Sequence, residues 1–163
     1  TPTTTAGGIS TRRPPIQAEA PAVVDIVDRS TRSRMMKSIR GKDTAPERLV
    51  RKYLHRAGLR FRLGGAGLPG RPDIVLPRYC AAVFVHGCFW HRHQGCRFTT
   101  TPATNVEFWR AKFAANVTRD WASESRLKAI GWSPLVIWEC QTSEIEALDE
   151  LVWQILSCEC EIR

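Results

Sequence analysis

The stretch CAAVFVHGCFWHRHQGC, residues 80–96, passes from a short apolar run directly into three histidines, two further cysteines and two adjacent large aromatic residues. A second apolar run, DIVL at 73–76, precedes it, and Pro77 and Arg78 separate the two runs. Short apolar runs bounded by turn residues are typical of buried strands. We therefore expect two consecutive strands, with chemically active side chains at the end of the second strand.

Helical patterns lie on both sides of these strands. A capping box, T-A-P-E, begins at Thr44 ahead of apolar residues at helical spacing, and Gly58 ends that helix. The alternating segment LRFRL, residues 59–63, predicts a half-buried strand, and GGAGLPGRP at 64–72 predicts a loop.

The C-terminal half repeats this alternation. A second capping box, T-N-V-E at 104–107, predicts a helix that extends, with or without a break, to Gly131. PLVIWEC at 134–140 predicts a fourth strand, and S-E-I-E at 143–146 predicts the cap of a last helix. The apolar face of that helix consists of Ile145, Leu148, Val152 and Ile155. The order helix, three strands, helix, strand, helix indicates an α/β fold with a mixed central sheet flanked by helices.

The charge is unevenly distributed along the 163 residues, whose net charge is +8. Residues 1–72 contain 15 Lys and Arg against 5 Asp and Glu, whereas residues 73–163 contain 9 against 11. A basic N-terminal part followed by a nearly neutral remainder favours a polyanion as partner, nucleic acid above all. The alternative explanation is that the charge serves solubility alone. We expect residues 1–28 to be a disordered or flexible leader and residues 29–163 to be one domain, whose basic segment 29–42 becomes ordered only against a partner.

The apolar runs are too short for a membrane span, and the first residues lack the apolar region of a signal peptide. The sequence thus predicts a cytoplasmic protein, in which disulfides are disfavoured. The six cysteines are therefore expected to be metal ligands, buried thiols or both.

Four of the cysteines and histidines are spaced as a Cys₃His set. Cys88, His93 and Cys96 lie within nine residues, and Cys140 ends the last predicted strand. Four ligands of this type suit a structural zinc ion with no open position. The alternative is that these are ordinary thiols and a surface histidine. The competing cysteines are Cys80, Cys158 and Cys160, of which the last two offer a second metal pair.

Catalytic candidates surround the two central strands. L-P-G-R-P-D, residues 68–73, places Asp73 at the start of a strand, near the Val85 carbonyl and His86 if the strands are adjacent. These oxygens suit Mg²⁺, which acts on phosphodiesters, although a single Pro-Asp pair is better explained by Asp73 as a plain turn or loop residue. His86 and His91 are candidates for proton transfer, and Asp120 for orienting one of them.

The chain resembles the very-short-patch repair (Vsr) endonucleases, which are DNA mismatch-nicking enzymes with a restriction-endonuclease-like fold. The resemblance extends from about Thr31 to Cys140. It is carried, in order, by T-R-S-R-M-M, D-T-A-P-E, L-P-G-R-P-D, H-G-C-F-W-H, P-A-T-N-V-E-F-W, N-V-T-R-D and V-I-W-E-C.

The resemblance implies roles for these residues. Asp73, helped by the Val85 carbonyl, would hold catalytic Mg²⁺, and Cys88, His93, Cys96 and Cys140 would hold structural Zn²⁺. The other active-site positions of the family match Glu47, which a capping box also explains, together with His86, His91 and Asp120. The chain departs from the family in two places: Val85 stands where threonine is usual, and the loop HRHQGC is one residue longer before its second cysteine.

The resemblance also implies a DNA interface. Phe89 and Trp90 would wedge between base pairs beside a mismatch, with Met36 entering from the other groove. Trp109, Lys112, Asn116, Arg119 and the segment 29–42 would contact DNA. Trp132, Trp138 and Trp153 are instead expected to be core residues.

These expectations combine into a Mg²⁺-dependent, zinc-stabilised endonuclease. It would nick one strand of double-stranded DNA, 5′ of the thymine in T·G mismatches left by deamination of 5-methylcytosine. We expect a monomeric, nucleoid-associated prokaryotic protein, with mismatch-repair proteins as further candidate partners. The alternatives are a non-catalytic zinc-braced DNA-binding module and a nuclease that cuts matched DNA in both strands. A zinc deaminase fits poorly, because the sequence lacks H-x-E followed by P-C-x-x-C.

Overall fold

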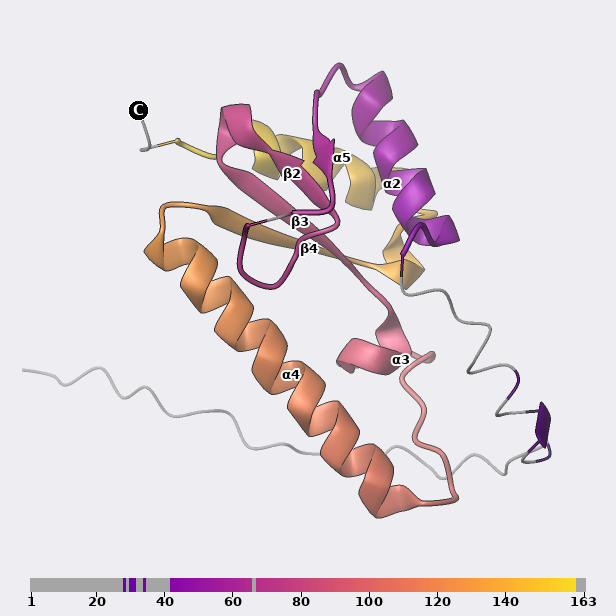
Figure 1. Cartoon of the computed structure of the whole chain (residues 1–163). Coiled ribbons are helices and arrows are strands. Elements are labelled where there is room, and N and C mark those ends of the chain that lie inside the picture. Colours follow the sequence, from indigo (N-terminus) through magenta and orange to yellow (C-terminus); the bar gives the residue numbers. More distant parts are fainter. Residues whose placement is uncertain (1–27, 29, 32–33, 35–41, 66, 161–163) are drawn as a thin grey trace, which may run out of the picture.

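A mixed four-stranded sheet lies between two layers of helices in the computed structural model, which describes residues 28, 30, 31, 34, 42–65 and 67–160 (Figure 1). The strands are β1 (Arg62–Leu63), β2 (Ile74–Leu76), β3 (Ala81–His86) and β4 (Ser133–Trp138), in the spatial order β1-β2-β3-β4. The helices are α2 (Ala45–Arg56), α3 (Cys88–His91), α4 (Val106–Ala129) and α5 (Ile145–Leu156). Two 3₁₀ turns, Pro77–Tyr79 and Glu139–Gln141, follow β2 and β4.

Strand direction fixes where the functional residues meet. β2 is antiparallel to β1 and to β3, whereas β3 and β4 are parallel and pair over their whole length. The start of β2 therefore lies beside the end of β3, and β3 and β4 end together. The predicted mixed α/β architecture is confirmed.

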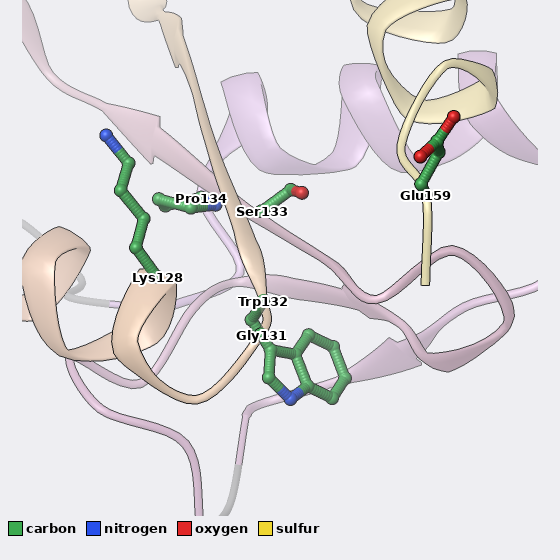
Figure 2. A pocket seen from close by; sticks show the side chains of 6 residues that line it. All are labelled: Lys128, Gly131, Trp132, Ser133, Pro134 and Glu159. Atoms are coloured by element: carbon green, nitrogen blue, oxygen red, sulfur yellow. The ribbon is translucent and has the colours of Figure 1, made fainter. Parts of the chain in front are cut away.

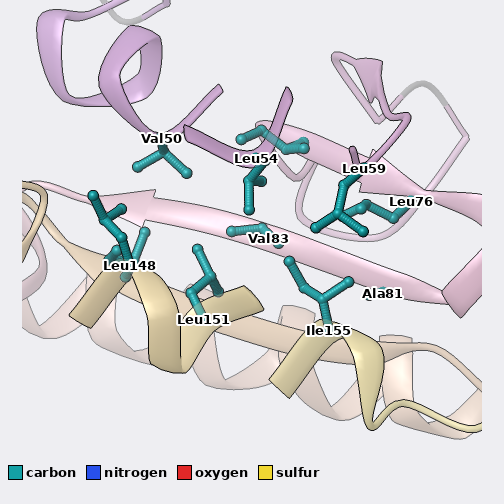
Figure 3. Packing of buried hydrophobic residues seen from close by; sticks show 11 residues of the cluster. Val50, Leu54, Leu59, Leu76, Ala81, Val83, Leu148, Leu151 and Ile155 are labelled. Atoms are coloured by element: carbon teal, nitrogen blue, oxygen red, sulfur yellow. The ribbon is translucent and has the colours of Figure 1, made fainter. Parts of the chain in front are cut away.

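The core is built on both faces of β3. Ala81 and Val83 face α2 and α5 in a cluster that includes Leu54 and Leu151 (Figure 3). Ala82 and Phe84 face the opposite side, where Leu127 of α4 covers them. Because successive side chains of a strand point to opposite faces, an apolar run without alternation is what a strand covered on both sides requires.

The predicted cap of α2 is confirmed. Thr44 has an extended backbone, and its hydroxyl accepts a hydrogen bond from the Glu47 N–H. The Glu47 carboxylate in turn accepts a hydrogen bond from the Thr44 N–H. Val50 and Leu54 are the apolar residues that this helix buries.

Three local predictions are wrong. Residues 104–107 form no capping box, because the N-cap of α4 is Asn105, whose φ of 55° is left-handed and whose side chain makes no cap hydrogen bond. Residues 143–146 form none either, since Glu144 is the N-cap of α5 and lacks a side-chain cap. The strand predicted at 59–63 is reduced to β1, and both of its residues are exposed.

The C-terminal region differs from expectation in two further ways. Trp153 is 63% exposed and Ile145 62% exposed, because α5 buries the face of Leu148, Leu151 and Ile155 instead. Cys80 and Cys160 form a disulfide between Cα atoms 5.1 Å apart, so the expectation that all six cysteines are metal ligands or thiols is wrong. The pairing arises because the chain after α5 returns to the start of β3.

None of the helices in the described residues is long and apolar enough to cross a membrane. Residues 1–27 of the predicted leader 1–28, Met36 and most of the basic segment 29–42 lie outside the described residues.

Candidate active site and metal centre

Asp73 lies immediately before β2 and is tied to β3 by two hydrogen bonds. Its backbone N–H donates to the Val83 carbonyl at 3.0 Å, and its Oδ2 accepts the Val85 N–H at 2.8 Å. The expected proximity to Val85 is therefore present, although the contact shown is to the amide of Val85 and not to its carbonyl. His86, the last residue of β3, follows Val85 directly in the chain.

The surroundings of Asp73 suit a cation. Burial raises the pKa of its carboxyl and the charge of Glu47 adds to this, whereas the Val85 N–H lowers the pKa. Among the described residues, no hydrogen-bond donor reaches its Oδ1. A poorly solvated carboxylate with an uncommitted oxygen is a good ligand for a hard cation such as Mg²⁺.

The side chains of His86, His91 and Asp120 form a group whose possible metal-ligand atoms all lie within 4.8 Å of one another. The two imidazole rings stack with centroids 3.9 Å apart and an interplanar angle of 9°. His91 Nδ1 lies 2.6 Å from Asp120 Oδ2, so the carboxylate fixes the ring and its tautomer and leaves Nε2 for proton exchange. Burial, followed by the charge of His91, lowers the pKa of His86 to about 4, which makes His86 neutral near pH 7.

Glu47 is buried at the first turn of α2, and four donors surround its carboxylate. Oε1 accepts the Thr44 N–H and hydroxyl, while Oε2 accepts the Asp43 N–H and an Arg51 N–H. A carboxylate offers about four lone-pair positions, so these donors fill its capacity. Glu47 is thus a fixed anion that also caps the helix.

The four predicted zinc ligands converge. The ligand atoms of Cys88, His93, Cys96 and Cys140 all lie within 4.8 Å of one another. His93 Nδ1 is 3.6 Å from Cys88 Sγ and 3.3 Å from Cys140 Sγ. A tetrahedral zinc ion with Zn–S of about 2.3 Å and Zn–N of about 2.05 Å separates S and N by about 3.6 Å, so the donor set fits zinc.

Trp138 lies between the candidate zinc ligands and the His86–His91–Asp120 group. From the sequence, Trp138 was instead expected in the core. Its indole stacks on His93 at 4.2 Å and 4°, and meets His86 edge-on at 5.5 Å. The available signal was its place in V-I-W-E-C, two residues before the last predicted zinc ligand.

Phe89 and Trp90 of α3 lie in an aromatic group on α4. Phe89 packs edge-on against Trp109 and Phe113, with centroids 5.7 Å and 5.1 Å away. Both residues are half-buried, and neither belongs to the two core clusters of the described residues. Trp109 itself is buried, at 9% exposure.

Polar groups border this aromatic group. Lys112 Nζ lies 5.8 Å from the ring centroids of both Trp90 and Phe108. Asn116 donates from Nδ2 to the Trp90 carbonyl at 3.0 Å, and Arg119 donates to Asn116 Oδ1 at 2.6 Å. Asn116 therefore anchors α3 at Trp90.

A shallow pocket of about 330 Å³ lies elsewhere, at the junction of α4 and β4. In Figure 2, Lys128 projects from the last turn of α4 and Glu159 from the C-terminal tail, with Trp132, Ser133 and Pro134 between them. None of the candidate site residues line it, and its size does not suit a duplex.

Comparisons with known proteins agree with this geometry. The family described as DNA mismatch endonuclease Vsr matches residues 24–97. The chain is 44% identical over 128 residues to the DNA mismatch endonuclease Vsr of Escherichia coli (strain K12), a match covering 78% of this chain and 81% of that protein.

Two nicking enzymes are similarly related. Type II nicking enzyme V.XorIIP of Xanthomonas oryzae pv. oryzae is 42% identical over 134 residues, covering 82% of this chain and 98% of that protein. Type II nicking enzyme V.NmeAIP of Neisseria meningitidis is 41% identical over 137 residues, with 82% and 97% covered. On these matches, the chain belongs to the Vsr family of DNA mismatch endonucleases.

Proposed function

We propose that this protein is a DNA endonuclease of mismatch repair that nicks one strand 5′ of the thymine in a T·G mismatch. Family membership supports the endonuclease activity. The observation that carries the proposal is the His86–His91–Asp120 group at the end of β3, with Asp73 bonded to the neighbouring Val85 and within electrostatic reach of His91. Open α/β sheets bind ligands at the carboxyl ends of their strands, and the resemblance implies a restriction-endonuclease-like version of this arrangement.

Each of the candidate active-site residues has a separate role in phosphodiester hydrolysis. Asp73 and the Val85 carbonyl would hold Mg²⁺, which when bound supplies charge stabilisation at the phosphate and an activated water. The His91–Asp120 pair moves a proton at Nε2 of His91, because Asp120 occupies Nδ1. Neutral His86 stacks against His91 and restricts its ring. Glu47 lines the site as a fixed negative charge.

Zinc would hold α3, the short helix that carries Phe89 and Trp90. Cys88 and His93 flank Phe89, Trp90 and His91, so one metal would fix both the wedge and a catalytic histidine. Mispaired steps cost less to unstack than paired ones, so insertion of Phe89 and Trp90 would favour mismatches. Met36 would enter from the opposite groove, and Lys112, Asn116, Arg119 and Trp109 would support the DNA around the wedge. We further propose a monomer acting in the prokaryotic cytoplasm, with mismatch-repair proteins as candidate partners.

A strand-specific nicking assay tests the proposal. The substrates are duplexes labelled on either strand that carry T·G or T·A at one position, incubated with Mg²⁺. We expect a nick only in the thymine strand of the T·G duplex. Asp73→Asn should abolish nicking but retain binding to the T·G duplex.

The matched control is Glu124→Gln, which alters a partly buried carboxylate one turn beyond Asp120 on α4 and should nick normally. Cleavage of both strands of T·A DNA would instead identify a nuclease for matched DNA. Binding without any nick would identify a DNA-binding module.

A further inference from the structure

Arg51 on α2 joins two acidic residues next to the active site. Its guanidinium donates to Asp43 Oδ1 at 2.6 Å and to Glu47 Oε2, and its side chain is only 17% exposed. Its Nε is buried and has no hydrogen-bond partner among the described residues. Buried donors of this kind are rare, so Arg51 retains one donor for a water or a ligand oxygen.

Arg51 is the only charged group among the four donors to Glu47; the others are two backbone N–H groups and the Thr44 hydroxyl. The orientation of Glu47 therefore depends on several donors, but compensation of its charge depends on Arg51. Both residues also act electrostatically on Asp73, Glu47 favouring its protonated form and Arg51 its charged form. Without Arg51, the charge of Glu47 would act on Asp73 without the opposing charge that Arg51 supplies.

We propose that Arg51 is a positioning residue, which holds the Glu47 carboxylate and offsets its charge beside Asp73. This inference rests on the proposed function, since it assigns Asp73 to a divalent cation. Removing the positive charge should make the site bind a divalent cation more tightly. It should also slow nicking, because Glu47 loses one of its four donors and the site repels the phosphate more strongly.

The test compares Arg51→Gln with Arg51→Lys in the zinc-loaded, full-length protein without DNA. Binding of Mn²⁺ is followed through the electron paramagnetic resonance signal of the free ion. We expect Arg51→Gln to lower the Mn²⁺ dissociation constant at least threefold. Arg51→Lys retains the charge and should stay within twofold of the unmodified protein. Asp73→Asn should abolish this binding, which identifies the site.

Nicking of the T·G duplex is measured on the same proteins. We expect kcat at saturating Mg²⁺ to fall at least tenfold in Arg51→Gln. A smaller fall is expected in Arg51→Lys, because a single ammonium does not reproduce the two-pronged bridge. The matched control is Arg48→Gln, which removes an exposed arginine of the same helix that contacts Asp43 but not Glu47 and should change neither quantity.

A double-mutant cycle separates positioning from general stability. If Arg51 acts on the rate through Glu47, then adding Arg51→Gln to Glu47→Gln should change kcat less than twofold. Independent, additive effects on kcat would overturn the proposal, as would unchanged or weakened Mn²⁺ binding in Arg51→Gln. If the unmodified protein fails to nick but the Mn²⁺ shift is present, the proposed function fails and the charge role of Arg51 stands. If the protein nicks the T·G duplex but Arg51→Gln does not lower the Mn²⁺ dissociation constant, only the role proposed for Arg51 fails.

Discussion

Trp138 illustrates how a single side chain serves two centres, because its indole lies between zinc-ligand candidate His93 and active-site candidate His86. Ring pairs of this kind contribute about 0.5–1.5 kcal/mol each beyond their buried area. Residues that orient metal ligands typically change metal affinity about 10–100-fold when lost. We therefore expect Trp138→Leu to lower zinc affinity by about 10-fold or more, measured by competition with a chromogenic chelator. Trp153→Leu, which alters an exposed tryptophan of α5, should leave zinc affinity unchanged; equal losses in both variants would contradict the assignment.

At this same scale, the sequence predicted which residues meet but not how they touch. Asp73 and His86 could be predicted to lie close together, because one apolar run begins at Asp73 and the next one ends at His86. The pairing register, which decides that Val85 offers Asp73 its N–H, is a property of two strands and is not written in either. The stacking of His86 on His91 likewise depends on the tight turn of α3, in which the His91 N–H bonds to the Gly87 carbonyl.

At the scale of elements, the two threonine capping boxes give a paired prediction. Thr44 caps α2, whereas Thr104 does not cap α4. We expect Thr44→Ala to lower the free energy of unfolding by about 1 kcal/mol, because it removes both a cap and a donor to Glu47. Thr104→Ala should change it by less than about 0.5 kcal/mol. Urea denaturation measures both, and a larger loss at Thr104 would show that the second box forms after all.

The contrast between these boxes explains why helices were predicted better than their ends. Periodicity located α2 and α5, since burial of one face applies over many residues, whereas α4 was located through a capping box that does not form. A capping box needs an extended N-cap backbone, and the chain reaches α4 through Asn105 in a left-handed conformation. That approach is set by the preceding loop, which Arg92 anchors through Thr100 and Thr101. Long-range contacts of this kind leave no pattern in four consecutive residues.

On the scale of the whole molecule, charge and aromatic groups distinguish α4 from α5. Residues 139–160, which include α5, contain six Asp and Glu and no Lys or Arg, and α5 covers the face of the sheet opposite α4. Lys112 and Arg119 lie on α4 beside the aromatic group. A polyanion is therefore expected on the side of α3 and α4. The sequence indicated the uneven charge but could not show that α4 and the acidic α5 lie on opposite faces of the sheet, nor foresee the Cys80–Cys160 disulfide between positions 80 residues apart.

The zinc group joins the ends of β3 and β4 to the loop after α3, so its removal should affect the whole molecule. Cys96→Ala removes one of the four candidate ligands, whereas Cys158→Ala removes a half-buried thiol that donates to the Gln154 carbonyl at 3.1 Å. Structural zinc contributes on the order of 10 kcal/mol of binding free energy to small domains. We expect Cys96→Ala to lose its zinc, to melt at a lower temperature and to nick poorly, because Trp90 and His91 lose their support. Cys158→Ala should retain one zinc per chain, measured by elemental analysis, and should nick normally. Retention of zinc by Cys96→Ala would exclude Cys96 as a ligand, whereas loss of zinc from Cys158→Ala would place the metal at the C-terminal cysteines.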